Sequence, residues 1–75
     1  MEVKNLREFT VLIERDEDGW LVGSVVELPG CFTQAKTLDE LMERIKEAIE
    51  AYLDAQEMPK EKIEFVGVQR IKVKA

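Results

Sequence analysis

The chain has 75 residues, one cysteine, no histidine and a formal net charge of −5. These values exclude an internal disulfide and a histidine base, and the acidic balance argues against autonomous binding to nucleic acid. We expect one domain over residues 1–75. A domain this small buries only about 60% of its unfolded surface, so we also expect self-association, as a homodimer or a higher oligomer.

Two absences in the sequence bear on its location. No apolar run approaches the roughly 20 residues that span a bilayer, and residues 1–5 lack the apolar core of a signal peptide. We therefore expect a cytoplasmic protein that does not enter a membrane.

A β-hairpin is predicted first. Phe9, Val11 and Ile13 recur at every second position, which is the period of a strand. An Asp-Gly pair, Asp18-Gly19, then separates this run from a second apolar alternation. Such a pair between two strand patterns is a strong hairpin signal.

The second strand, residues 20–27, is apolar on both of its faces. One face carries Trp20, Val22 and Val26, and the other carries Leu21 and Val25. We expect Leu12 of the first strand to join Leu21 and Val25. A half-solvated antiparallel strand should instead be polar on one face, so we expect another copy or another protein to cover the outer face.

A turn, a short strand and a helix start follow without a break. Pro29-Gly30 predicts the centre of a type II turn, and residues 31–35 predict a third strand that pairs back on the second. Thr37, with Glu40 three positions later, predicts a capping box.

From Leu38 the apolar period changes to that of a helix. The predicted stripe consists of Leu38, Leu41, Met42, Ile45, Ala48, Ile49, Tyr52 and Leu53. Glu40 and Arg44 form a favourable i, i+4 pair on the charged side. The helix should end by residues 56–58, because Pro59 disfavours its continuation.

Residues 63–73 predict a last strand, which gives the order β-β-β-α-β. We expect an α+β fold in which three strands form an antiparallel meander, one helix covers one face, and a fourth strand returns beside the first.

Few residues suggest chemistry. Cys31 lacks a base or an electropositive setting in the sequence, so we interpret it as a small packing residue. Glu14, Asp16 and Glu27 lie near strand ends and could hold Mg²⁺, as the carboxylates of nucleases do. The alternative is that they are turn residues and solvated charges. No catalytic residue, bound metal or cofactor is predicted.

The chain resembles the HicB-like antitoxin family over nearly its whole length. The resemblance rests on an aromatic strand that leads into the turn Leu28-Pro29-Gly30-Cys31, on the Thr-led helix start at residues 37–41, and on the helix end Ala-Ile-x-x-Tyr-Leu at residues 48–53. The resemblance implies a β-β-β-α-β domain with a partial ribonuclease-H-like fold.

The resemblance also implies a role and partners. HicB-type proteins bind and neutralise HicA toxins, small basic proteins that cleave messenger RNA, and an acidic chain suits such a partner. Many members add a C-terminal DNA-binding domain. This chain ends after one strand, so we expect no direct DNA binding.

Two other functional hypotheses remain open beside the antitoxin hypothesis. One is a metal-dependent, ribonuclease-H-like nuclease that uses the three carboxylates, and the other is an orphan structural oligomer without a toxin. For the antitoxin, the predicted partner-binding residues follow exposure near the turn. They are Trp20, Glu27, Phe32, Thr33 and Gln34.

Overall fold

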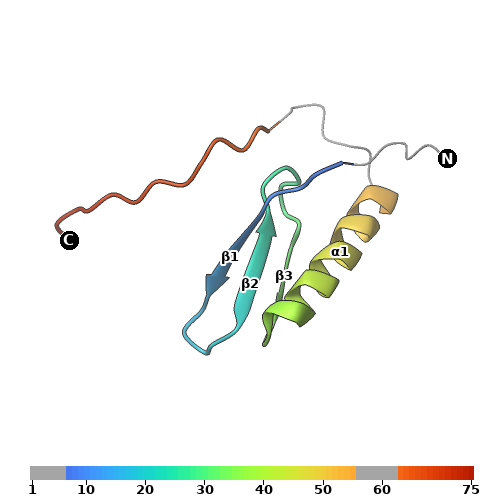
Figure 1. The fold of residues 1–75 in the computed structure, drawn as a ribbon, viewed down its shortest axis with the longest axis horizontal. Coiled ribbons are helices and arrows are strands. Elements are labelled where there is room, and N and C mark those ends of the chain that lie inside the picture. Colours follow the sequence, from blue (N-terminus) through green and yellow to red (C-terminus); the bar gives the residue numbers. More distant parts are fainter. Residues whose placement is uncertain (1–6, 56–62) are drawn as a thin grey trace.

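A three-stranded antiparallel sheet carries one helix along one of its faces (Figure 1), in a computed structural model that describes residues 7–55 and 63–75. The strands are β1 (Val11–Arg15), β2 (Leu21–Val25) and β3 (Phe32–Ala35), in the order β1-β2-β3, and the helix α1 spans Leu38–Ala55. The predicted α+β class, the meander and the helix are confirmed. β2 begins one residue later and ends two residues earlier than predicted, and β3 begins one residue later.

The β1–β2 connection forms because Asp16 closes the loop with both its backbone and its side chain. The Asp16 N–H donates to the Trp20 carbonyl at 2.9 Å, and the Asp16 carboxylate accepts the N–H groups of Asp18 and Trp20, each at 2.9 Å. Gly19 supplies the positive φ of 87°. A turn followed by a left-handed glycine is a common three-residue hairpin loop, so the predicted hairpin is confirmed.

The second turn has the geometry that Pro29-Gly30 predicts. The Cys31 N–H donates to the Leu28 carbonyl at 3.0 Å, and Gly30 adopts a φ of 84°. A positive φ directly after a proline is the mark of a type II turn. The turn sends the chain back along β2, where Val25 N–H donates to the Cys31 carbonyl at 2.9 Å.

The start of α1 is capped by Thr37. The Thr37 hydroxyl oxygen accepts the Glu40 N–H at 3.2 Å, and the hydroxyl lies 3.4 Å from the Glu40 carboxylate. Glu40 also pairs with Arg44 at 3.8 Å, as predicted, on the exposed side of the helix. The predicted helix end at residues 56–58 lies outside the described residues. Among the helices of the described ranges, none combines the length and apolar character of a membrane span.

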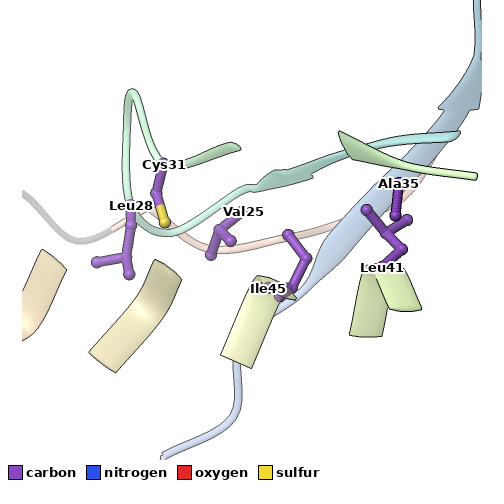
Figure 2. Close-up of a cluster of buried hydrophobic side chains, with 6 residues drawn as sticks. All are labelled: Val25, Leu28, Cys31, Ala35, Leu41 and Ile45. Atoms are coloured by element: carbon purple, nitrogen blue, oxygen red, sulfur yellow. The ribbon is translucent and has the colours of Figure 1, made fainter. Parts of the chain in front are cut away.

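The core lies between α1 and the sheet (Figure 2). Its buried members are Val25, Leu28, Cys31, Ala35, Leu41 and Ile45. Leu28 and Leu41 are fully buried, at 0% exposure, and each such side chain contributes about 1.5–3 kcal/mol. Gly23 lets the helix approach β2 closely, because a Cβ there would lie 3.0 Å from Ile45 Cδ1.

The predicted fourth strand does not form within the described chain. Residues 63–75 are exposed throughout and run away from the sheet as an extended segment (Figure 1). A strand requires a neighbour that takes its N–H and C=O groups, and no described residue of the same chain does so here. The partial ribonuclease-H-like arrangement, which includes that strand, is therefore not complete in residues 7–55 and 63–75 of one chain.

Candidate protein-binding face

The sheet has one face toward α1 and one face away from it. Gly23 faces α1, as its contact with Ile45 shows, so its strand neighbours Val22 and Ser24 face away. Residues directly opposite each other in antiparallel strands share a face, so the register extends this assignment to β1 and β3. We call the side away from the helix the open face. It comprises Leu12, Glu14, Trp20, Val22, Ser24, Phe32, Gln34 and Lys36.

The open face carries more apolar surface than a solvated sheet face should. Phe32 is 66% exposed and Leu12 is 39% exposed, while Trp20 and Val22 are half-buried. Solvated faces of antiparallel sheets are normally polar. The prediction that the second strand is apolar on both faces is confirmed, and among the described residues nothing covers the outer side.

Leu12 lies on the opposite face from the predicted one. It pairs with Ser24, and it therefore shares the open face with Val22 rather than the helix side with Leu21 and Val25. The error came from the hairpin loop, whose closing pair sets the register. Because the loop places Asp16 opposite Trp20, every even-numbered residue of β1 falls on the open face.

Trp20 and Lys36 form a cation–π pair at the hairpin end of this face. The Lys36 Nζ lies 4.2 Å from the centroid of the Trp20 ring. A cation over an indole face is attracted by about 0.5–1 kcal/mol at an exposed site. The contact places a positive charge beside the aromatic ring. Nothing was predicted for Lys36, although the β2–β3 register, in which Leu21 lies opposite Ala35, places it next to Trp20.

The predicted partner-binding residues are divided between two faces and a turn. Trp20, Phe32 and Gln34 lie together on the open face. Thr33 pairs with Gly23, and it therefore points toward the helix side, where it is half-buried. Gln34 is anchored through its backbone, because its carbonyl accepts a hydrogen bond from Arg44 Nη1 at 2.8 Å.

Glu27, the fifth predicted contact, has a structural partner in the turn that follows β2. Its carboxylate accepts the Thr10 N–H at 2.7 Å. Partial burial alone raises the pKa of Glu27, but hydrogen bonds from the Thr10 backbone and hydroxyl and from its own N–H outweigh it, so the pKa lies below its ordinary value. The carboxylate is held ionised against the start of β1.

The three carboxylates of the nuclease hypothesis are not brought together. Glu14 and Asp16 lie toward the hairpin, whereas Glu27 lies at the other end of β1, beside Thr10. Over residues 7–55 and 63–75, no three acidic, cysteine or histidine side chains form a group that could hold a metal ion.

Cys31 packs in the core. Its exposure is 6%, and burial raises the pKa of its thiol. A buried thiol with a raised pKa is a packing residue rather than a nucleophile, as the sequence indicated.

Comparison with known proteins gives a consistent result. Residues 9–72 match the family model described as the HicB_like antitoxin of bacterial toxin-antitoxin systems. The chain is 57% identical over 67 residues to a UPF0150 protein of Archaeoglobus fulgidus, a match that covers 89% of this chain and 96% of the relative. It is 48% identical over 69 residues to a UPF0150 protein of Synechocystis, covering 92% and 99%. A UPF0150 protein of Thermotoga maritima is 36% identical over 73 residues, covering 95% and 97%.

Proposed function

The chain belongs to the HicB-like antitoxin family, and from this premise we propose that it binds and neutralises a small, basic, HicA-like toxin that cleaves messenger RNA. Neutralisation takes place by direct protein–protein contact, without catalysis by this chain and without direct contact with DNA. The proposal places this complex in the cytoplasm.

The observation that carries the proposal is the uncovered apolar face of the sheet. Centres of protein interfaces are enriched in aromatic side chains, and the exposed Phe32 and the half-buried Trp20 provide two on the same face. Leu12 and Val22 lie on the same side of the sheet and extend the apolar area across β1 and β2. Such a surface suits a folded partner that excludes water from it.

Charge supports a basic partner. Residues 7–55 contain five basic and twelve acidic side chains, a net charge of −7. Opposite net charges accelerate encounter and disfavour acidic competitors, although they add less to affinity than to rate. We therefore assign contact to Phe32, Trp20 and Gln34 on the open face. Glu27 and Thr33 contribute less, because Glu27 is bonded to Thr10 and Thr33 points toward α1.

The test uses the HicA-like protein encoded beside this chain in its own genome, if a neighbouring gene encodes one. Both proteins are purified, and calorimetry measures their affinity while an RNA-cleavage assay measures inhibition. We expect a 1:1 stoichiometry of chains and loss of cleavage at saturation. Phe32→Ala should weaken binding by about tenfold or more, as truncation of a central aromatic anchor does.

The matched control is Leu38→Ala, which truncates another exposed apolar side chain, 52% exposed at the start of α1 and away from the open face. It should leave binding unchanged. Absence of a complex at micromolar concentrations, with full RNA cleavage in the presence of excess chain, would contradict the proposal and favour the orphan oligomer. Equal losses for Phe32→Ala and Leu38→Ala would show that binding uses another surface.

A further inference from the structure

The segment 63–75 has the side chains of a buried strand but none of its contacts. Val66 is 91% exposed, and Val68, Ile71 and Val73 are 71%, 79% and 78% exposed. Figure 1 shows this segment extended and separate from the sheet. A folded monomer rarely leaves so continuous an apolar run in water. The segment therefore requires a partner surface with free hydrogen-bonding groups.

The outer edge of β1 offers those groups. Val26 N–H donates to the Thr10 carbonyl at 2.8 Å and Asp16 N–H donates to the Trp20 carbonyl at 2.9 Å, so the even-numbered residues of β1 bond toward β2. Antiparallel pairing alternates, and the N–H and C=O groups of Val11, Ile13 and Arg15 therefore point outward. No described residue pairs with this edge, since β1 is an outer strand of the sheet.

The other edge of the sheet, formed by β3, is less able to pair with an added strand. Arg44 already donates to the carbonyl of Gln34 in β3 at 2.8 Å. In addition, α1 packs mainly against β2 and β3. Ile13 therefore remains 44% exposed although it points to the helix side. An added strand beside β1 would find both free backbone groups and an apolar contact.

Charge selects this edge and also the direction of pairing. Residues 63–75 contain three basic side chains and one acidic side chain, a net charge of +2, against −7 for residues 7–55. The basic ones, Arg70, Lys72 and Lys74, are near the end of the segment, and Glu64 is near its start. The two ends of β1 differ in charge. Arg7 and Glu8 cancel before the strand, whereas residues 14–18, which are Glu14, Arg15, Asp16, Glu17 and Asp18, have a net charge of −3. Parallel pairing brings the basic end of the segment to this acidic end of β1, whereas antiparallel pairing brings it to residues 7–8, which have no net charge.

We infer that residues 63–75 of one copy form a fourth strand, parallel to β1, on the sheet of a second copy, and that the exchange is reciprocal. The occupant comes from a second copy because the segment leads away from the sheet of its own chain. Exchange of an identical element is a low-cost route to a symmetric dimer. It completes the four-stranded sheet that the sequence predicts, with the strand supplied by the partner. This inference does not depend on the proposed toxin.

The first test measures the mass of the purified full chain by light scattering over a range of concentrations. A dimer is expected. The double variant Val66→Pro/Ile71→Pro, which removes one N–H from each side of the segment, should be monomeric with an unchanged helical circular dichroism signal. The control, Val66→Thr/Ile71→Thr, keeps β-branched side chains and backbone donors and should remain dimeric. A monomeric wild type, or a proline variant that is still dimeric, would overturn the inference.

The second test separates exchange between copies from pairing within one chain. One variant reverses the sign of the charges on the segment (Arg70→Glu/Lys72→Glu/Lys74→Glu). The other reverses the sign of the charges at the hairpin (Glu14→Lys/Glu17→Lys/Asp18→Lys). Asp16 is spared because its carboxylate holds the loop. Each variant alone should dimerise about tenfold more weakly or worse, because like charges meet at both exchanged strands.

An equimolar mixture should restore dimers, since in the mixed dimer both segments again meet an opposite charge. Mass spectrometry under native conditions identifies the mixed species. If the segment paired with its own β1, mixing would restore nothing, and that result would overturn the exchange. The toxin-binding experiment has a separate readout, so either proposal can fail alone.

Discussion

Residues 7–55 and residues 63–75 contain similar apolar side chains, but several of these are buried in the first region and all are exposed in the second. In the first region, α1 covers the helix side of β2 and β3, and Leu28, Leu41 and Ala35 have no exposed surface. In the second region, all residues are exposed and none of the described backbone groups bonds to the sheet. The two regions differ in whether a partner element is present in the same chain.

This difference follows from how each element satisfies its backbone. A helix closes its hydrogen bonds within its own segment, so α1 needs the sheet only for its apolar stripe. A strand closes none of them alone, and its pattern therefore describes a pair of segments rather than one. The segment 63–75 has the apolar and β-branched side chains of a strand and still requires an edge to pair with.

The largest expected effect is the loss of a core side chain in the first region. Leu41→Ala should lower the free energy of unfolding by about 2–5 kcal/mol, because a fully buried leucine leaves a cavity under the sheet. Urea denaturation at low protein concentration measures it. Met42→Ala, the next residue and 39% exposed, is the control and should cost clearly less.

The same measurement tests the contrast between the regions. Val66→Ala in the segment should change the free energy of unfolding of a single copy by less than about 0.5 kcal/mol, as exposed substitutions do. At concentrations where the dimer forms, the same substitution should weaken dimerisation. A loss for Val66→Ala that matches Leu41→Ala in dilute protein would show that the segment packs on its own chain.

Most of residues 7–55 could be predicted from the sequence because each signal there acts locally. Asp16 and Gly19 make their own loop, Pro29-Gly30 makes its own turn, and Thr37 caps the next residues along the chain. The failures concern relations between distant segments. Leu12 was assigned to the wrong face because its face depends on which residue it opposes across the hairpin.

The composition of the open face could be predicted only in part, for the same reason. Trp20 and Phe32 were recognisable as aromatic residues beside turns, but their position on one face depends on the register of β2 with β3. Lys36 was missed because its contact with Trp20 is a cross-strand relation. Thr33 and Glu27 were chosen by closeness in sequence to the turn, and the structure gives them inward and turn contacts instead.

Two glycines, one in each region, provide a comparison in which the expected loss of stability is intermediate. In Gly23→Ala the new Cβ would lie 3.0 Å from Ile45 Cδ1 and 3.2 Å from Val11 Cγ1. Such overpacking should cost about 1–3 kcal/mol in thermal or urea unfolding. Gly67→Ala in the segment meets nothing within 4 Å, so in a single copy it should cost close to nothing.

A second substitution tests whether contact with Ile45 causes the loss of stability in Gly23→Ala. Ile45→Val removes the Cδ1 atom that the new methyl group would contact, so Gly23→Ala/Ile45→Val should recover part of the stability lost by Gly23→Ala. Strictly additive losses in the double variant would mean that the contact with Ile45 is not the cause. The expected interaction energy would locate the close approach of α1 to β2.

The smallest expected effect concerns Glu27, whose carboxylate joins the turn after β2 to the start of β1. The pKa of Glu27 is lowered in the folded chain, so its contribution to stability is present above the unfolded-state pKa and is lost as the pH falls through the folded-state pKa. Glu27→Gln keeps an acceptor oxygen but removes its charge, so it should lower the free energy of unfolding at neutral pH by about 1 kcal/mol, the difference between a hydrogen bond to a charged acceptor and one to a neutral acceptor.

The pH dependence distinguishes this bond from a general effect of charge. The difference between wild type and Glu27→Gln should shrink as the pH falls, because the wild-type carboxyl group then also becomes neutral. Glu50→Gln, on the exposed side of α1, is the control for removing one charge from an acidic protein. A gap that persisted at low pH, or that appeared equally in Glu50→Gln, would contradict the assignment. Because Thr10 leads directly into β1, Glu27→Gln should also loosen the end of the edge on which the exchanged strand is proposed to begin, and it should weaken dimerisation at neutral pH.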